Sequence, residues 1–326
     1  MTLTNPDAAR QNTSGLTADT TIASVIRRRR RDSDRPVWME EPPLAIKILK
    51  AITLAWIVVI MIFPLVYVIA VSFSSAEDVL AGGLVLFPAN PTLDAYRAIF
   101  EGGVVNRALR VSVGLTVFGT LAQMVVTTML AYGLSKPGVP GSRIALFIVL
   151  GAFLFSPGMI PSYLLVKELG MLDTYAALIV PGLVNAFNLI VLRNFFMNIP
   201  QELLDAARVD GASDVQIFFR ITLPLSKAAL AVISLFYGVA IWNAFFNAVL
   251  YIYDTSKWPI QLVLRQYVLQ GSSLAQAAEF NPNQPPPPPQ TIQMAIVVVA
   301  TIPILLVYPF LQKYFTKGVL TGAIKG

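Results

Sequence analysis

The hydrophobic positions of this chain gather in six long runs that polar segments separate. Each run is about as long as the 20 apolar residues that a helix needs to cross a bilayer. The six runs cover residues 51–73, 111–134, 144–166, 175–197, 227–251 and 292–311. The pattern predicts an all-α integral membrane protein with six transmembrane helices.

The polar segment between the fourth and fifth runs predicts two short helices joined at a glycine. Pro200 fits the first turn of a helix, and Glu202 and Asp205 place negative charge near its positive end. Gly211 can adopt the left-handed conformation that ends a helix, and Pro224 is expected to stop the second helix. We call residues 200–224 the elbow.

Two further patterns within the elbow indicate how it is built and used. Leu203, Ala206 and Ala207 share one helix face, and the two alanines leave it shallow enough for another protein to approach. Ser213 and Gln216 have the spacing of a capping box, which begins the second helix on a new axis. An ordinary amphipathic connector between two spans is the alternative interpretation.

Composition supports a membrane protein and excludes several kinds of chemistry. The chain is 56% hydrophobic and 13% charged, with a mean hydropathy of +0.66. It contains neither cysteine nor histidine, which removes disulfides, thiolate nucleophiles and most zinc sites. No phosphate-binding loop is present and the six runs contain no Asp or Glu, so we expect no ATP hydrolysis, no other enzyme activity and no metal site in this chain.

The basic residues predict the topology. The net charge is +6, and most of the 24 basic residues flank the apolar runs on one side, as cytoplasmic loops do, so nucleic acid is not an expected partner. Residues 1–45, with five arginines at 27–31, are expected to be a disordered basic cytoplasmic tail, and residues 46–326 a single six-span domain. Both termini and the elbow are then cytoplasmic, and residues 252–290, with five prolines at 285–289, form an extended outside stretch.

Neutral amides inside the runs are candidates for lining a solute pathway. Asn243 and Asn247 are four residues apart on the fifth run, beside Trp242, and Asn185 and Asn188 are three apart on the fourth. Amides next to aromatic rings suit a hydroxyl-rich solute such as a sugar. The alternative is that these amides form hydrogen bonds between helices.

The elbow resembles the EAA loop of ATP-binding-cassette (ABC) importer permeases. Asp205-Ala206-Ala207 is followed after three residues by Gly211 and after nine more by Ile221-x-Leu223-Pro224, with Asp at a position where the family usually has Glu. The resemblance implies a cytoplasmic coupling helix held in a groove of a separate ATPase subunit. The residues expected to couple to the ATPase are Glu202, Asp205, Ala206, Ala207, Asp210, Gly211, Ile221, Leu223 and Pro224.

Other segments are similar to maltose-type carbohydrate permeases, near the importers of alginate and other oligosaccharides. They are the stretch around Trp242 and Asn243, the sequence Lys257-Trp258-Pro259, and residues 308–318. The resemblance implies a bacterial inner-membrane complex with a second, related permease, an extracytoplasmic solute-binding protein and two ATPase subunits that hold ATP and Mg²⁺. Its substrate would be a sugar or oligosaccharide. An ABC permease for another solute, and a secondary carrier, are the alternatives.

Overall fold

A computed structural model describes residues 43–155, 157–270 and 287–323. Every regular element in these ranges is helical. The predicted basic tail lies outside the described residues except for its last three positions. Of the predicted outside stretch 252–290, residues 271–286 lie outside the described residues. The described residues form two units, one ending at Phe63 and the other beginning at Pro64.

Helix α2 (Leu44–Ser72) contains this boundary and has Pro64 within it. Its residues between 44 and 63 are all exposed within their own unit, although most are apolar. A helix that is apolar all round is expected where lipid is the solvent. The helix begins earlier than the predicted first run.

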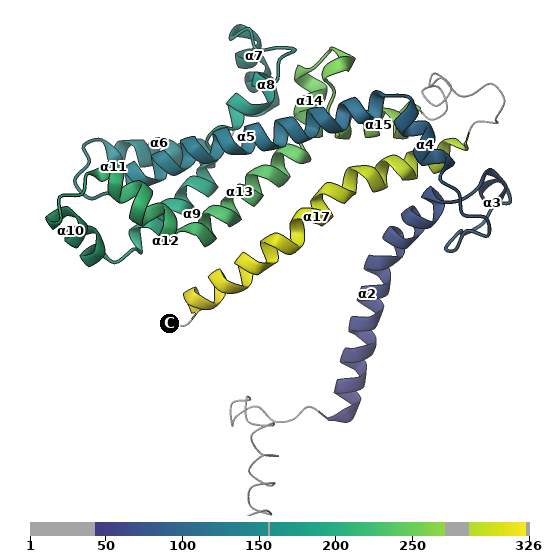
Figure 1. The fold of residues 1–326 in the computed structure, drawn as a ribbon, viewed down its shortest axis with the longest axis horizontal. Coiled ribbons are helices and arrows are strands. Elements are labelled where there is room, and N and C mark those ends of the chain that lie inside the picture. The colour runs from purple at the N-terminus through teal and green to yellow at the C-terminus, as the bar shows by residue number, and fades with distance from the viewer. Residues whose placement is uncertain (1–42, 156, 271–286, 324–326) are drawn as a thin grey trace, which may run out of the picture. The chain divides into compact units, whose positions relative to one another are not determined.

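Helix α5 (Val104–Ser135) is the centre of the second unit, and α13 (Lys227–Trp242) and α9 (Ala186–Met197) run alongside it (Figure 1). The three helices share a core of fully buried apolar side chains that includes Ala131, Leu189 and Ile233. Gly119 permits the close approach, because a Cβ there would lie 2.8 Å from Cδ1 of Ile241.

A second core lies where α17 (Pro289–Ala323) meets α4 (Asp94–Glu101), α5 and α15 (Ile260–Gln270). Helix α15 was not predicted and falls within the long outside stretch expected at residues 252–290. The apolar residues Ile260, Val263 and Tyr267 repeat at helical spacing, which is a sequence pattern that predicts a helix here. All three side chains are buried in the structure. The backbone N–H of Ile260 also donates to Oγ of Ser112 at 2.8 Å.

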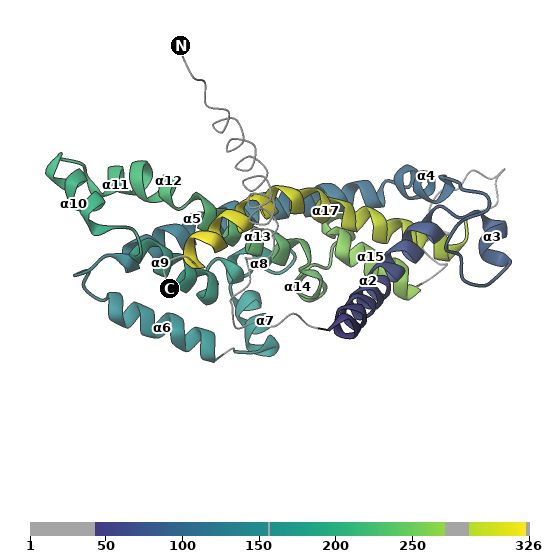
Figure 2. The ribbon, with the colours of Figure 1, turned by 90° about the horizontal axis from the view of Figure 1, so that it is seen from below.

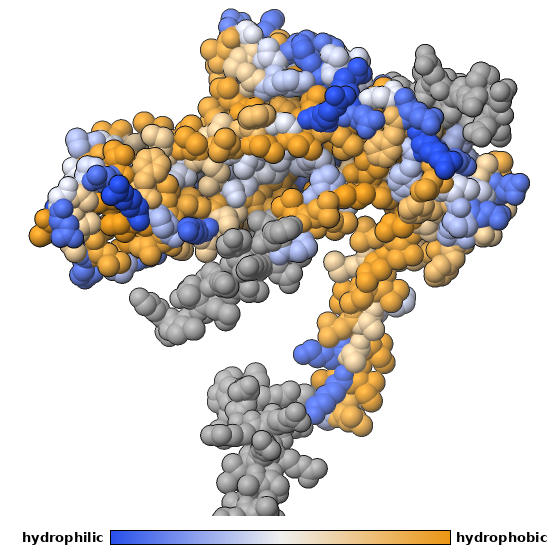
Figure 3. All heavy atoms as spheres, in the orientation of Figure 1, coloured by the Kyte–Doolittle hydropathy of each residue, from blue (hydrophilic) through white to orange (hydrophobic). Residues whose placement is uncertain are grey.

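Shorter elements connect these helices. They are α3 (Ala76–Leu80), α6 (Ser142–Leu154), α7 (Met159–Glu168), α8 (Ala176–Ile179), η2 (Val180–Gly182), α10 (Gln201–Val209), α11 (Asp214–Ile217), η3 (Phe218–Thr222), α12 (Leu223–Leu225), α14 (Phe245–Tyr251) and η4 (Thr255–Lys257). Figure 2 shows α10, α11 and α12 together at one end of the bundle. In the orientation of Figure 1, hydrophobic side chains cover the middle of the bundle and hydrophilic ones gather near α10 and α4 (Figure 3).

Several predicted runs are divided between helices in the structure, and Pro157 interrupts the third run as its sequence predicts. The third run is divided between α6 and α7, where Pro157 and a left-handed Gly158 interrupt it, and the fifth is divided between α13 and α14. Proline disfavours a helix interior, so Pro303 and Pro309 predict breaks in the last run, but both lie inside α17. By length and composition, three described helices can cross a membrane, and five can if two bent pairs count as spans. The six-span count stays a prediction.

Candidate functional site

The first helix of the elbow ends as predicted. Pro200 precedes α10 and Glu202 lies in its first turn. Gly211 has a left-handed φ of 81°, and its N–H donates to the carbonyl of Arg208 at 3.0 Å. The N–H of Ala212 donates to the carbonyl of Ala207 at 2.9 Å. These two bonds form a Schellman motif, which confirms the role predicted for Gly211.

The second helix of the elbow begins with the predicted capping box. The N–H of Gln216 donates to Oγ of Ser213 at 3.3 Å, and the N–H of Ser213 donates to Oε1 of Gln216 at 2.9 Å. This helix passes through the π-helical turn η3 and α12 and ends at Leu225, one residue after the stop predicted at Pro224. The chain then bends by 81° into α13.

The inner side of the elbow is attached to the end of α5. Lys136 forms an ion pair with Asp214, and the hydroxyl of Tyr132 donates to the backbone carbonyl of Asp214 at 3.0 Å. The rings of Tyr132 and Phe218 lie 4.7 Å apart, and the ammonium group of Lys136 lies over the Tyr132 ring. The hydrogen bond from Lys136 lowers the pKa of the Asp214 carboxyl, so this ion pair is present throughout the neutral range.

The outer side of the elbow has no cover from the described part of this chain. Helix α10 has no buried residue, Leu203 is 49% exposed and Val209 is 88% exposed. Ala206 is exposed as the shallow face requires, while Asp205 forms an ion pair with Arg208 at 2.7 Å. Of the other coupling candidates, Ile221 and Leu223 are half-buried and Pro224 and Asp210 are exposed. The elbow therefore presents a mixed apolar and charged surface that is free to meet another protein.

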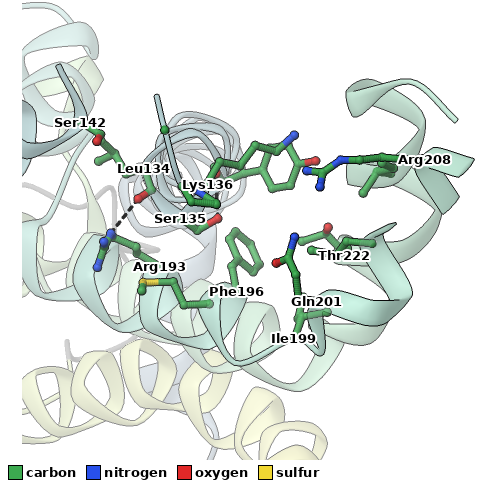
Figure 4. Close-up of a pocket in the computed structure, with 16 residues that line it drawn as sticks. Leu134, Ser135, Lys136, Ser142, Arg193, Phe196, Ile199, Gln201, Arg208 and Thr222 are labelled. Carbon is green, nitrogen blue, oxygen red and sulfur yellow. Dashed lines mark hydrogen bonds between the residues drawn. The ribbon is translucent and has the colours of Figure 1, made fainter. Parts of the chain in front are cut away.

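A hollow of about 370 Å³ lies behind the elbow (Figure 4). Arg193 from α9, Lys136 at the end of α5 and Arg208 from α10 line it, with Phe196 between them. The Nε group of Arg193 donates to the carbonyl of Leu134 at 2.8 Å. This bond satisfies one of the carbonyls that the end of α5 leaves without a helical partner.

The two amides predicted on the fourth run have structural partners. Asn185 is the N-cap of α9, and its Oδ1 accepts the backbone N–H of Asn188 at 3.1 Å. Asn188 is 5% exposed and packed among the helices. The two residues therefore lie at a helix start, following the break at η2, rather than on one face of a continuous helix.

The two amides of the fifth run are not on one helix either. Helix α13 ends at Trp242, Asn243 follows as its C-cap, and Asn247 lies on α14. Both amides are exposed, whereas Trp242 is buried and its indole N–H donates to the carbonyl of Ala300 at 3.1 Å. Trp242 thus joins α13 to α17, and a role of the exposed amides in a solute pathway stays a prediction.

A buried hydrogen-bond relay around the break in the fourth run was not foreseen. The N–H of Asn185 donates to the hydroxyl of Tyr237 at 3.1 Å, and this hydroxyl lies 2.7 Å from Oγ1 of Thr127. Thr127 in turn donates to the carbonyl of Leu183 at 3.4 Å. Tyr237 and Thr127 come from α13 and α5, so the relay ties both helices to the break that precedes α9. It satisfies backbone groups that the interrupted helix leaves unpaired.

A second cluster that was not foreseen joins the loop before α8 to the loop after α14. Asp173, with a left-handed φ of 57°, accepts the N–H groups of Tyr253 and Asp254, each at 3.0 Å. Lys257 donates to Oδ2 of Asp173 at 2.8 Å, and this bond lowers the pKa of Asp173 and raises the pKa of Lys257. Within the described ranges, no three His, Cys, Asp or Glu side chains could together hold a metal ion.

Comparison with known proteins agrees with this architecture. The chain is 50% identical over 268 residues to the polygalacturonan/rhamnogalacturonan transport system permease protein YtcP of Bacillus subtilis (strain 168), covering 82% of this chain and 93% of that protein. It is 29% identical over 283 residues to the arabinooligosaccharides transport system permease protein AraQ of Halalkalibacterium halodurans (strain ATCC BAA-125 / DSM 18197 / FERM 7344 / JCM 9153 / C-125). This match covers 85% of this chain and 96% of that protein.

A solved structure and a family model give the same result. The fold matches a chain of the bacterial ABC transporter involved in the import of the acidic polysaccharide alginate, with a TM-score of 0.79 and 31% identity. The match covers 86% of this chain and all of that chain. Residues 44–321 match the family described as binding-protein-dependent transport system inner membrane component. Since this match includes most of the chain, the protein belongs to that family of transport components.

Proposed function

We propose that this chain is the membrane-spanning permease subunit of an ABC importer for oligosaccharides. The observation that carries the proposal is the elbow, which is attached to α5 on one side and uncovered on the other. The names of the similar permeases, which refer to polygalacturonan, rhamnogalacturonan and arabinooligosaccharides, support a carbohydrate substrate. ATP and Mg²⁺ would be held by two partner ATPase subunits.

The remaining partners follow from the same proposal. A second, related permease completes the pathway, and an extracytoplasmic binding protein delivers the oligosaccharide. The elbow then lies on the cytoplasmic side of the bacterial inner membrane together with both termini. Asn243 and Asn247 are the exposed amides that can donate and accept hydrogen bonds to sugar hydroxyls along this pathway.

The contacts of the elbow give a mechanism for coupling. Helix α9 leads into the elbow and α13 leaves it, while Lys136 and Tyr132 attach it to α5. An ATPase that moves the elbow therefore moves the ends of three packed helices as one body. The relay through Tyr237 carries the same displacement to the break before α9.

Substitution of Gly211 tests the elbow. A Cβ at Gly211 has no neighbour within 4 Å, so the left-handed φ is the sole obstacle to a side chain within the described structure. Gly211→Val places a β-branched residue in this conformation, at a cost of about 1–2 kcal/mol or more. We expect normal membrane insertion but loss of the ATPase subunit on purification. Gly211→Asn is the matched control, because Asn tolerates this conformation. Unchanged ATP-dependent uptake by Gly211→Val would remove the elbow from the mechanism.

Two further measurements separate the alternatives. The purified chain reconstituted alone should transport nothing, whereas a secondary carrier would show uptake without ATPase subunits. In the assembled complex, a binding protein loaded with galacturonate oligosaccharide should stimulate ATP hydrolysis. Stimulation by a non-sugar solute alone would indicate an ABC permease for a different substrate.

A further inference from the structure

The hollow behind the elbow has the chemistry of an anion site. Its lining includes Lys136, Arg193 and Arg208 but no carboxylate. The carboxylates that pair with Lys136 and Arg208 belong to Asp214 and Asp205, which do not line the hollow. Two of the three lining cations are therefore paired with carboxylates that lie outside the hollow, and among the described residues Arg193 is the one without such a pair.

Arg193 is the cation that can hold a ligand. In the described part of the chain, its hydrogen bond uses Nε and the neutral carbonyl of Leu134, so its charge has no carboxylate partner there. A guanidinium group has five N–H donors, and the two terminal amino groups are left for another acceptor. Two parallel donors of this kind match the oxygen atoms of a phosphate group.

The start of α6 adds to the same potential. Ser142, the first residue of this 13-residue helix, lines the hollow, and the N-cap Gly141 provides no side-chain hydrogen bond. The N–H of Ser142 donates to the carbonyl of Val139 at 3.3 Å, but the positive end of the helix dipole still favours an anion at this point.

The apolar part of the wall indicates which anion is bound. Phe196, Met197 and Leu134 also line the hollow, and Met197 is 52% exposed. A lipid can place its phosphate group at Arg193 and its acyl chain against Met197, whereas free phosphate would leave this apolar surface to water.

We propose that the hollow binds the phosphate group of an anionic lipid of the inner leaflet, with Arg193 as its main ligand. The assignment to the inner leaflet rests on the function proposed for the elbow. The bound lipid joins the ends of α5 and α9 to the start of α6, the helices that support the elbow from behind.

The test measures lipid binding to the complete transporter complex in nanodiscs. Native mass spectrometry compares retention of phosphatidylglycerol and phosphatidylcholine by the wild type and by Arg193→Gln. We expect Arg193→Gln to weaken phosphatidylglycerol binding about tenfold, which corresponds to about 1.4 kcal/mol. Phosphatidylcholine binding should be unchanged. A lower melting temperature is expected from the lost bond to Leu134, and it affects both lipids alike. Arg143→Gln is the matched control, because Arg143 is exposed beside Ser142 and does not line the hollow.

The control separates a built site from general surface charge. Loss of phosphatidylglycerol in Arg193→Gln with retention in Arg143→Gln supports the proposal, and an equal loss in both variants overturns it. Arg193→Lys keeps the charge but loses the paired donors, so it should bind phosphatidylglycerol more weakly than the wild type and more tightly than Arg193→Gln; binding by a folded Arg193→Lys protein that is no tighter than that of Arg193→Gln would also contradict the site.

A second measurement separates lipid from soluble phosphate. Inorganic phosphate added to the complex in phosphatidylcholine nanodiscs should bind no more tightly than the millimolar range. Micromolar binding would identify soluble phosphate as the ligand and overturn the lipid assignment. Failure of the proposed function is distinguishable, because Gly211→Val reports on ATPase attachment whereas Arg193→Gln reports on lipid binding, and Gly211 does not line the hollow.

Discussion

Substitution of Tyr237 by Phe tests the relay that ties α5 and α13 to the break before α9. Tyr237 is 3% exposed and Thr127 is fully buried, so water does not replace a lost bond. Because Thr127 donates to Leu183, the proton between the two hydroxyls is that of Tyr237. The hydroxyl oxygen of Tyr237 then accepts from Asn185. Removing the Tyr237 hydroxyl leaves the N–H of Asn185 without an acceptor, and it leaves Oγ1 of Thr127 without the proton that it accepts.

The magnitude follows from these two groups. A buried hydrogen bond contributes about 0.5–1.5 kcal/mol and an orphaned buried donor costs about 1–3 kcal/mol. Interhelical hydrogen bonds in membranes average about 0.6 kcal/mol. We expect Tyr237→Phe to lower the free energy of unfolding by about 1–2 kcal/mol, measured by reversible denaturation of the chain in mixed micelles.

A double-mutant cycle with Thr127→Val isolates the shared bond. The two substitutions together should destabilise by less than the sum of the single effects, with an interaction energy of about 0.5–1.5 kcal/mol. Tyr163→Phe is the control, since its hydroxyl meets that of Tyr253 at an exposed position and should cost less than about 0.5 kcal/mol. Additive effects of Tyr237→Phe and Thr127→Val would refute the relay.

Three other predictions follow from the described contacts. Gly119→Leu should destabilise by about 1–3 kcal/mol through the clash with Ile241, whereas Gly114→Leu on the same helix meets nothing within 4 Å; equal melting temperatures for the two would contradict the close approach of α5 and α13. The hydrogen bond from Lys136 lowers the pKa of Asp214 in the folded protein. The stabilisation that the pair gives to the folded state is therefore complete above the ordinary Asp pKa, and it is lost as pH falls through the lower pKa of the folded state. The melting-temperature difference between wild type and Asp214→Asn should therefore be constant from about pH 6 to 8 and shrink below about pH 4, and a change near neutrality would argue against the pair. Trp242→Phe should lower the free energy of unfolding by about 1 kcal/mol, because it removes the hydrogen bond from the indole N–H to the carbonyl of Ala300. A free energy of unfolding equal to that of the wild type would contradict a stabilising role of this bond.

The sequence was most informative where the determinants are local. The turn at Gly211 and the capping box of Ser213 and Gln216 depend on a few consecutive residues, and both are confirmed. The expected stop at Pro224 lies within one residue of the observed end at Leu225, whereas the π-helical turn before it was not predicted. Within the long apolar runs, hydropathy identified helices but not their breaks, so the amides at 243 and 247 were placed on one helix face when they lie on either side of a break.

The sequence by itself determined that the chain is a helical membrane protein with a capped, glycine-jointed elbow, because apolar length and helix capping are properties of short stretches. Only the tertiary structure decided which polar groups meet. Thr127 and Tyr237 are 110 positions apart, and the hollow combines residues from α5, α6, α9 and the elbow. Such contacts depend on how helices cross and on which polar groups burial forces into pairs, and no periodicity along one segment records this.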